Sequence, residues 1–201
     1  MTKKFWRFQL NTATVILIPA TIGINYLGKL FAELLHLPLW LDCIGTCLAA
    51  YVAGPIVGAI VGAAINIIYG LMLNPVSTVY ALANVMIAIV TAWFAHMGYF
   101  QNVRKALLVG LAVGILSTIV SISLNLFLWG GRADGLIGNA VLSLCRSYNL
   151  PVWIASLCEV LSTDIPDKLI TMLSVCGIAQ GLPESLLDLY QVEDEPEENR
   201  A

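Results

Sequence analysis

Charged residues are scarce in this chain. Asp, Glu, Lys and Arg make up only 11% of its 201 residues, against 59% hydrophobic residues and a mean hydropathy of +0.84, whereas a soluble domain has about 25% charged residues. Too few polar residues remain to cover a globular surface, and no cluster of basic residues is present that would bind nucleic acid. The composition excludes a soluble enzyme, a nucleic-acid-binding protein and a disordered scaffold, and it predicts a protein of the lipid bilayer.

Motifs for metal binding, nucleotide binding and covalent catalysis are also lacking. The five cysteines are an odd number without a Cys-x-x-Cys pair, and there are only two histidines, so we predict neither a disulfide framework nor a metal site. No Gly-x-Ser-x-Gly, His-Glu-x-x-His or Gly-x-x-x-x-Gly-Lys-Ser/Thr sequence occurs. We predict that the chain is not an enzyme and has no cofactor of its own, and that another subunit supplies the energy for any active transport.

The few charges concentrate at the C-terminus. Residues 184–201 hold seven acidic residues and one arginine, a net charge of −6, while residues 1–183 sum to +3. We interpret residues 181–201 as an acidic, disordered cytoplasmic tail. Residues 1–10 are interpreted as a basic cytoplasmic N-terminus, and residues 11–180 as the membrane domain.

Long apolar runs predict the fold. About 20 mainly apolar residues are needed to cross the hydrocarbon layer of a membrane, and polar and turn residues divide this chain into six runs. They are residues 11–34, 40–53, 55–72, 77–98, 105–129 and 151–180. Gly54-Pro55 favours a turn between the second and third runs, although residues 40–72 are also compatible with one re-entrant hairpin. We predict an all-α integral membrane protein, a compact bundle of six transmembrane helices.

The basic residues predict the orientation of this bundle. Lys and Arg are enriched in cytoplasmic loops, and five of them share one side of a six-span bundle: Lys3, Lys4, Arg7, Arg104 and Lys105. Both termini are therefore predicted to be cytoplasmic. Residues 130–150 then lie outside, and their apolar residues recur at helical spacing, which predicts an amphipathic surface helix or lid.

Polar residues inside the apolar runs are the candidates for a binding site, because they are costly in a membrane and usually face the bundle interior or a water-filled cavity. In the predicted topology, polar groups from five spans lie in the outer half of the bundle: Asp42, Asn66, Asn84, Ser117, Ser121, Asn125 and Glu159. They predict a ligand pocket open to the outside, with Trp129 or Trp153 covering it. Each residue alone is equally compatible with a hydrogen bond that bridges two helices.

A second group of ionisable residues occupies the last span, in the segment Asp164-Ile-Pro-Asp-Lys168. Asp164 and Lys168 are spaced to pair on one helix face, and the proline between them bends the helix. With Asp167, the group is either a neutralised structural kink or a switch point or partner contact. Lys29 and Glu33 in the first span have the same spacing, and we interpret them as a salt-bridged anchor at the membrane interface.

Small residues at every fourth position form two stripes, one through Gly54, Gly58 and Gly62 and one within residues 106–118. In lipid, such stripes mark faces where helices approach closely. They are compatible with packing inside the bundle and with a surface that docks a partner.

Two runs of the sequence resemble the substrate-binding S components of energy-coupling factor (ECF) transporters. They are Pro38-Leu-Trp-Leu-Asp-Cys-Ile-Gly-Thr46, and Gly54-Pro-Ile-Val-Gly-Ala-Ile-Val-Gly62 with Asn66 after it. The resemblance covers about residues 11–180. It implies a multi-pass protein of a bacterial or archaeal cell membrane that captures a vitamin or similar micronutrient outside. It also implies partners: a T-type membrane subunit and two cytoplasmic ATPases, which would hold the ATP and Mg²⁺.

The resemblance further implies where substrate and partners bind. S components usually bind substrate with the last three spans and the first external loop, which agrees with the polar residues of the predicted pocket. They usually dock through an Ala-x-x-x-Ala pattern in the first span. Here Ala13 is followed at that spacing by Leu17, so Gly28-x-x-x-Ala32 is the nearest substitute, and the stripe through Gly54, Gly58 and Gly62 is the second choice.

Our main hypothesis is a membrane subunit that captures a small, polar organic nutrient. Glu159 would pair with an amine or another hydrogen-bond donor, Asn84 and Asn125 would orient the nutrient, and Ser121 and Asp42 would complete the site. The alternative is a stand-alone membrane sensor or scaffold whose acidic tail recruits a soluble partner. A membrane enzyme is the third hypothesis, and the sequence offers no nucleophile and base for it.

Overall fold

The structure is a computed structural model that describes residues 6, 8, 10–131 and 136–190. These residues form helices and connecting turns, without a strand in the described ranges. The predicted all-α class is therefore confirmed. The helices are α1 (Thr12–Leu34), α2 (Ile44–Ala53), α3 (Pro55–Met72), η1 (Pro75–Tyr80), α4 (Ala81–His96), η2 (Tyr99–Gln101), α5 (Val103–Trp129), α6 (Leu136–Ser147), α7 (Val152–Gly181) and α8 (Glu184–Asp188).

Local sequence signals explain where these helices begin. The side chains of Asn11 and Asn102 cap α1 and α5 by accepting the backbone N–H of Thr14 (2.8 Å) and Lys105 (2.9 Å), which satisfies donors that have no partner within the helix. Gly54 separates α2 from α3 in a conformation with φ of 91° that favours glycine, and Pro55 follows as the first residue of α3, a position that proline favours.

Four helical segments are long and apolar enough to cross a membrane: Thr12–Leu34, Pro55–Met72, Pro75–His96 and Val103–Leu128. The predicted second span is shorter than expected, because α2 has only ten residues and extends about 15 Å, half the thickness of the hydrocarbon layer. Helix α7 has 30 residues, but its ionisable residues set it apart from these four apolar segments. The count of six spans and the cytoplasmic location of the termini stay predictions.

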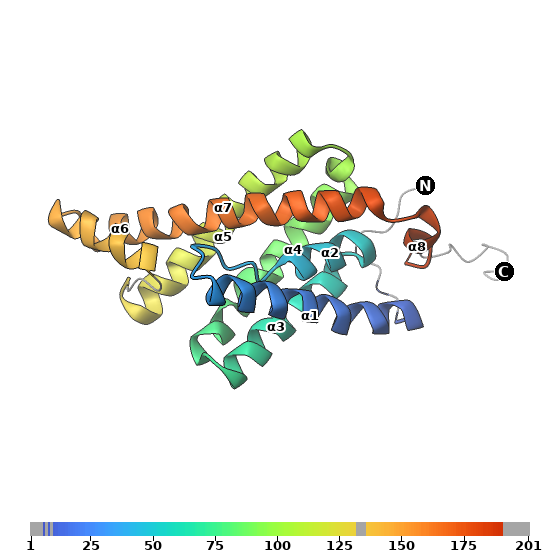
Figure 1. Ribbon diagram of the computed structural model, residues 1–201, viewed down its shortest axis with the longest axis horizontal. Helices are drawn as coiled ribbons and strands as arrows, with labels where there is room; N and C mark the ends of the chain where they lie inside the picture. The colour runs from blue at the N-terminus through green and yellow to red at the C-terminus, as the bar shows by residue number, and fades with distance from the viewer. Residues whose placement is uncertain (1–5, 7, 9, 132–135, 191–201) are drawn as a thin grey trace, which may run out of the picture.

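The long helix α7 spans the length of the molecule and packs mainly against α5 (Figure 1). Helix α6 packs against the beginning of α7 at the left of the picture, and α8 follows the other end. Helices α1, α2 and α3 pack against one another, and α4 packs against α2, α3 and α5. The expected helix within residues 130–150 is present as α6, whereas the predicted disordered tail begins instead with the short α8. Residues 191–201 of that tail lie outside the described part of the chain.

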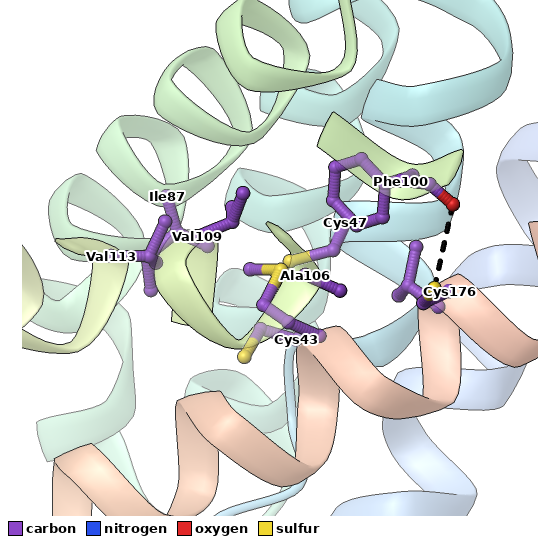
Figure 2. Packing of buried hydrophobic residues seen from close by; sticks show 10 residues of the cluster. Cys43, Cys47, Ile87, Phe100, Ala106, Val109, Val113 and Cys176 are labelled. Carbon is purple, nitrogen blue, oxygen red and sulfur yellow. Dashed lines mark hydrogen bonds between the residues drawn. The ribbon is translucent and has the colours of Figure 1, made fainter. Parts of the chain in front are cut away.

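A close-packed apolar cluster joins α2 and α4 to α5 and α7 (Figure 2). Ile87 of α4 and Val109 and Val113 of α5 meet Cys43 and Cys47, which lie just before and within α2. The cluster continues through Phe100 to α7, where the Cys176 thiol donates to the Phe100 carbonyl oxygen at 3.4 Å. This packing holds α2, α4, α5 and α7 in fixed positions around the cavity described next.

Candidate functional site

The described residues line a partly open cavity of about 590 Å³ between α1, α3, η1, α4, α5, α7 and the loop that joins α1 to α2. This volume lies in the range of about 300 to 1,000 Å³ that is typical of small-molecule sites. All of the polar residues that the sequence places in the pocket line this cavity: Asp42, Asn66, Asn84, Ser117, Ser121, Asn125 and Glu159. The structure thus brings them together from separate helices.

One wall of the cavity is built around Lys29 of α1. Its ammonium group donates to the Ser77 hydroxyl at 3.0 Å and pairs with the Asp42 carboxylate at 3.6 Å. The same ammonium group lies 4.1 Å from the centre of the Tyr69 ring, where the negative face of the ring attracts a cation. Glu33, the expected partner of Lys29, instead accepts a hydrogen bond from the Tyr69 hydroxyl. The prediction of a Lys29–Glu33 salt bridge is therefore wrong, and Lys29 is part of the cavity wall.

The opposite wall is formed by α5 and α7. Asp164 is 5% exposed and accepts a hydrogen bond from the Ser117 hydroxyl at 3.1 Å. Glu159 is also 5% exposed and lines the cavity. Asn125 donates to the Ser156 hydroxyl at 3.4 Å, so one of the predicted site residues also bridges two helices. This wall presents carboxylate and amide groups to the cavity from two helices that pack closely together.

Asp167 has a different role from its neighbours on α7. Its buried carboxylate accepts the backbone N–H groups of Trp40 (3.0 Å) and Leu41 (2.8 Å) with one oxygen and pairs with Lys168 through the other. Lys168 therefore pairs with Asp167, and the prediction of an Asp164–Lys168 pair is wrong. Asp167 fastens the loop between α1 and α2 to α7, and this loop lines the cavity through residues 36–40 and Asp42.

The loop needs this support because two of its residues have unusual backbone conformations. His36 has φ of 51° and Leu41 has φ of 47°, in the left-handed region that costs non-glycine residues free energy. The two backbone hydrogen bonds to Asp167 come from Trp40 and Leu41, at the end of the loop that contains the strained Leu41. Trp40 is thereby held in the cavity lining.

Asp42, Cys43 and Asp167 bring one ligand atom each to within 4.8 Å of one another, but they do not form a suitable metal site. Both carboxylate oxygens of Asp167 already accept hydrogen bonds, one of them from an ammonium group. The carboxylate of Asp42 pairs with Lys29. A metal ion would have to compete with both lysines, so the arrangement serves to hold the loop.

The glycines considered for docking lie mostly inside the bundle. A Cβ atom on Gly58 would lie 2.6 Å from the Ala50 Cβ, and one on Gly62 would lie 3.0 Å from the Asn84 carbonyl oxygen. A Cβ atom on Gly28 would lie 2.3 Å from the Leu41 carbonyl oxygen, and Ala32 is buried beside the cavity. The structure therefore favours packing within the bundle for Gly28, Gly58 and Gly62, while Gly54 forms the turn between α2 and α3.

Of the two tryptophans expected to cover the pocket, neither is found in the cavity lining of the described structure. Trp153 is 56% exposed at the start of α7 and is not among the residues that line the cavity. Trp129 ends α5, and its side chain lies outside the described part of the structure. Trp40, an aromatic residue that was not predicted to cover the pocket, lines the cavity instead.

Other residues of the lining were not predicted from the sequence, among them Lys29, Ser77 and Trp40. Lys29 had a usable signal, since it lies well inside an apolar run where a lysine is costly. Ser77 of η1 and Trp40 gave none, because a serine and a tryptophan near the end of a span are common features of membrane proteins.

Comparison of the chain with known protein families, with curated proteins and with solved structures finds no match. The geometry of the cavity is therefore the feature that bears on function. Its lining offers carboxylates, amides, hydroxyls and ammonium groups on rigid helices, an arrangement that binds a polar solute by several hydrogen bonds at once.

Proposed function

We propose that the chain is the substrate-capture subunit, or S component, of an ECF-type importer and binds a small water-soluble vitamin or similar micronutrient. The observation that supports this most directly is the cavity of about 590 Å³, where polar residues from five predicted spans meet in a chain with four strongly apolar helices. Polar groups at such positions are costly in a membrane protein and are usually retained for a solute or ion.

The position of the loop between α1 and α2 supports the same proposal. The loop lines the cavity with Trp40 and Asp42 and is fastened to α7 by Asp167. In the proposed orientation this loop faces the outside, so the nutrient enters from there. Glu159 pairs with an amine or another donor of the nutrient, and Asn84 and Asn125 orient it.

The proposed partners are a T-type membrane subunit and two cytoplasmic ATPases, which bind the ATP and Mg²⁺ that this chain has no motif to hold. Because Gly58 and Gly62 of α3 are packed inside the bundle, a partner would have to dock on another helix. Helix α1 exposes Ile16, Leu27 and Phe31, which are 64%, 65% and 54% accessible, and we propose that this apolar side of α1 contacts the T subunit or lipid.

The proposal is tested by isolating the tagged full-length protein from its native membrane in mild detergent and identifying the co-purifying proteins and small molecules by mass spectrometry. We expect a T-type subunit, two ATPases and a retained nutrient. Recovery of a different soluble partner, which is lost when residues 190–201 are deleted, would contradict the transporter and favour the sensor or scaffold.

Replacing Glu159 by Ala is expected to weaken nutrient binding by about 1.5 to 3 kcal/mol, the typical value of a hydrogen bond to a charged group. Isothermal titration of the purified protein with the nutrient recovered above measures this change. Asp188→Ala in α8 provides the matched control, since Asp188 does not line the cavity. Equal affinities of the wild-type and Glu159→Ala proteins would remove Glu159 from the site.

A further inference from the structure

The carboxylate and ammonium groups that line the cavity are already engaged within the protein. Lys29 pairs with Asp42, Lys168 pairs with Asp167, Glu33 accepts from Tyr69, Asp164 accepts from Ser117, and Glu159 also has an interaction partner. A ligand that binds one of these groups must share it with that partner or replace the partner. The polar groups of the lining that have no partner are therefore the more direct indication of what the cavity binds.

Asn84 of α4 is such a group, because its side chain makes no hydrogen bond to another residue of the described structure. The residue is only 4% exposed and lines the cavity. Among the described side chains, only Thr118 has a fully enclosed polar atom without a partner, so the Asn84 amide is open to the cavity. A buried amide without hydrogen bonds is costly and uncommon in native proteins. Asn84 thus requires partners that the chain itself does not supply.

The chemistry of the Asn84 amide defines the group that fits it. Its carbonyl oxygen accepts and its NH2 group donates, side by side in one plane. Two hydrogen bonds form with a planar group that has a donor and an acceptor on adjacent atoms, as when asparagine binds the edge of adenine. An ammonium ion would satisfy only the oxygen, and a carboxylate would satisfy only the NH2 group. The amide therefore favours an uncharged donor–acceptor group over an ion.

The surroundings of Asn84 hold this amide in place and leave it available. Its neighbours Ala83 and Ile87 also line the cavity from α4, and their apolar side chains do not compete for its hydrogen bonds. The α4 backbone packs closely on α3, since a Cβ atom on Gly62 would lie 3.0 Å from the Asn84 carbonyl oxygen. Asn125 differs, because its NH2 group already donates to the Ser156 hydroxyl at 3.4 Å. A ligand therefore gains more new hydrogen bonds from Asn84 than from Asn125.

We infer that Asn84 is the main recognition residue of the cavity and binds an uncharged, planar donor–acceptor group of the nutrient, such as a lactam, a ureido group or the edge of a heterocyclic base. This inference rests on the proposed function, because it assigns a substrate class to the same cavity. It adds the chemical group that the substrate carries, and it ranks Asn84 above Asn125 in binding.

The first test compares two asparagines of the lining in the purified full-length protein without ligand. Asn84→Leu replaces an unpartnered amide by an apolar side chain of similar branching, so we expect an unchanged or higher thermal unfolding temperature. Asn66→Leu is the matched control. Asn66 is 2% exposed, donates to the Gly62 carbonyl oxygen and accepts from Ser77, so its loss should lower the unfolding temperature. An equal fall in both variants would show that Asn84 serves the fold and would overturn the inference.

The second test measures binding of two probes by the same protein. Uracil has N–H and C=O groups on adjacent atoms of a planar ring, and 1,3-dimethyluracil has the same ring without N–H groups. We expect uracil to raise the unfolding temperature and the dimethyl compound to leave it unchanged. Asn84→Leu should weaken uracil binding about tenfold or more, and Asn125→Leu should weaken it less. No response to uracil, equal responses to both probes, or a larger loss in Asn125→Leu than in Asn84→Leu would contradict the inference.

The isolation experiment separates failure of this inference from failure of the proposed function. Recovery of a T subunit and ATPases with a nutrient that lacks a planar donor–acceptor group overturns the inference about Asn84 alone. Uracil binding that depends on Asn84, in a protein isolated without these partners, supports the inference about the cavity and contradicts the importer.

Discussion

Replacing Asp167 by Ala is expected to lower the free energy of unfolding by about 3 to 5 kcal/mol, the usual result when one partner of a buried ion pair is removed. The wild-type carboxylate is fully buried, pairs with Lys168 and accepts the backbone N–H groups of Trp40 and Leu41. Alanine leaves one buried ammonium group and two backbone donors without this acceptor. Chemical or thermal unfolding in detergent or nanodiscs measures the loss.

A double variant identifies the physical cause. Asp167→Asn with Lys168→Met removes both charges and retains an oxygen that accepts the two backbone N–H groups, so we expect it to recover most of the lost stability. Lys168→Met alone should be destabilising, because it leaves the Asp167 carboxylate buried without its ammonium partner. An Asp167→Ala protein as stable as the wild type would show that the loop and α7 are held together by other contacts.

The second large effect is expected from Gly45→Ala in α2. A Cβ atom on Gly45 would lie 2.0 Å from the backbone carbonyl oxygen of Thr21 in α1, and a backbone atom inside a helix has little freedom to move away. The contact is reinforced by Asn25, which accepts the Gly45 N–H at 2.6 Å and donates to the Thr46 hydroxyl at 2.8 Å. We expect the free energy of unfolding to fall by about 2 to 5 kcal/mol. The added methyl group overpacks the contact, and the buried hydrogen bonds of Asn25 break when α1 and α2 move apart.

Gly177→Ala is the matched control for this prediction. Gly177 lies inside α7, and a Cβ atom on it would meet nothing within 4 Å. Alanine there should be neutral or stabilise the protein by about 0.5 to 1 kcal/mol, because it restricts the unfolded chain. If the two variants unfold at the same temperature, the close approach of α1 and α2 is not a determinant of stability.

The sequence by itself determined the all-α class and most helix limits. The turn predicted at Gly54-Pro55 and the predicted runs 55–72 and 105–129 place the end of α2 and the limits of α3 and α5 within a few residues of where they lie, because glycine and proline act on their immediate neighbours. It also determined which polar residues are unusual. An asparagine or glutamate within an apolar run is costly wherever the helices pack, and Asn84, Asn125 and Glu159 all line the cavity.

Only the tertiary structure decided which of these groups become partners. Spacing along one helix suggested Lys29 with Glu33 and Asp164 with Lys168, but Lys29 pairs with Asp42 of the loop, and Lys168 pairs with Asp167. A spacing rule compares positions on one isolated helix, whereas a buried charge selects its partners from every element that packs around it. The packing of other elements also decided that α2 and α4 cover the glycine stripe of α3 and that the loop between α1 and α2 forms a wall of the cavity. The sequence of one helix does not specify which elements pack against it.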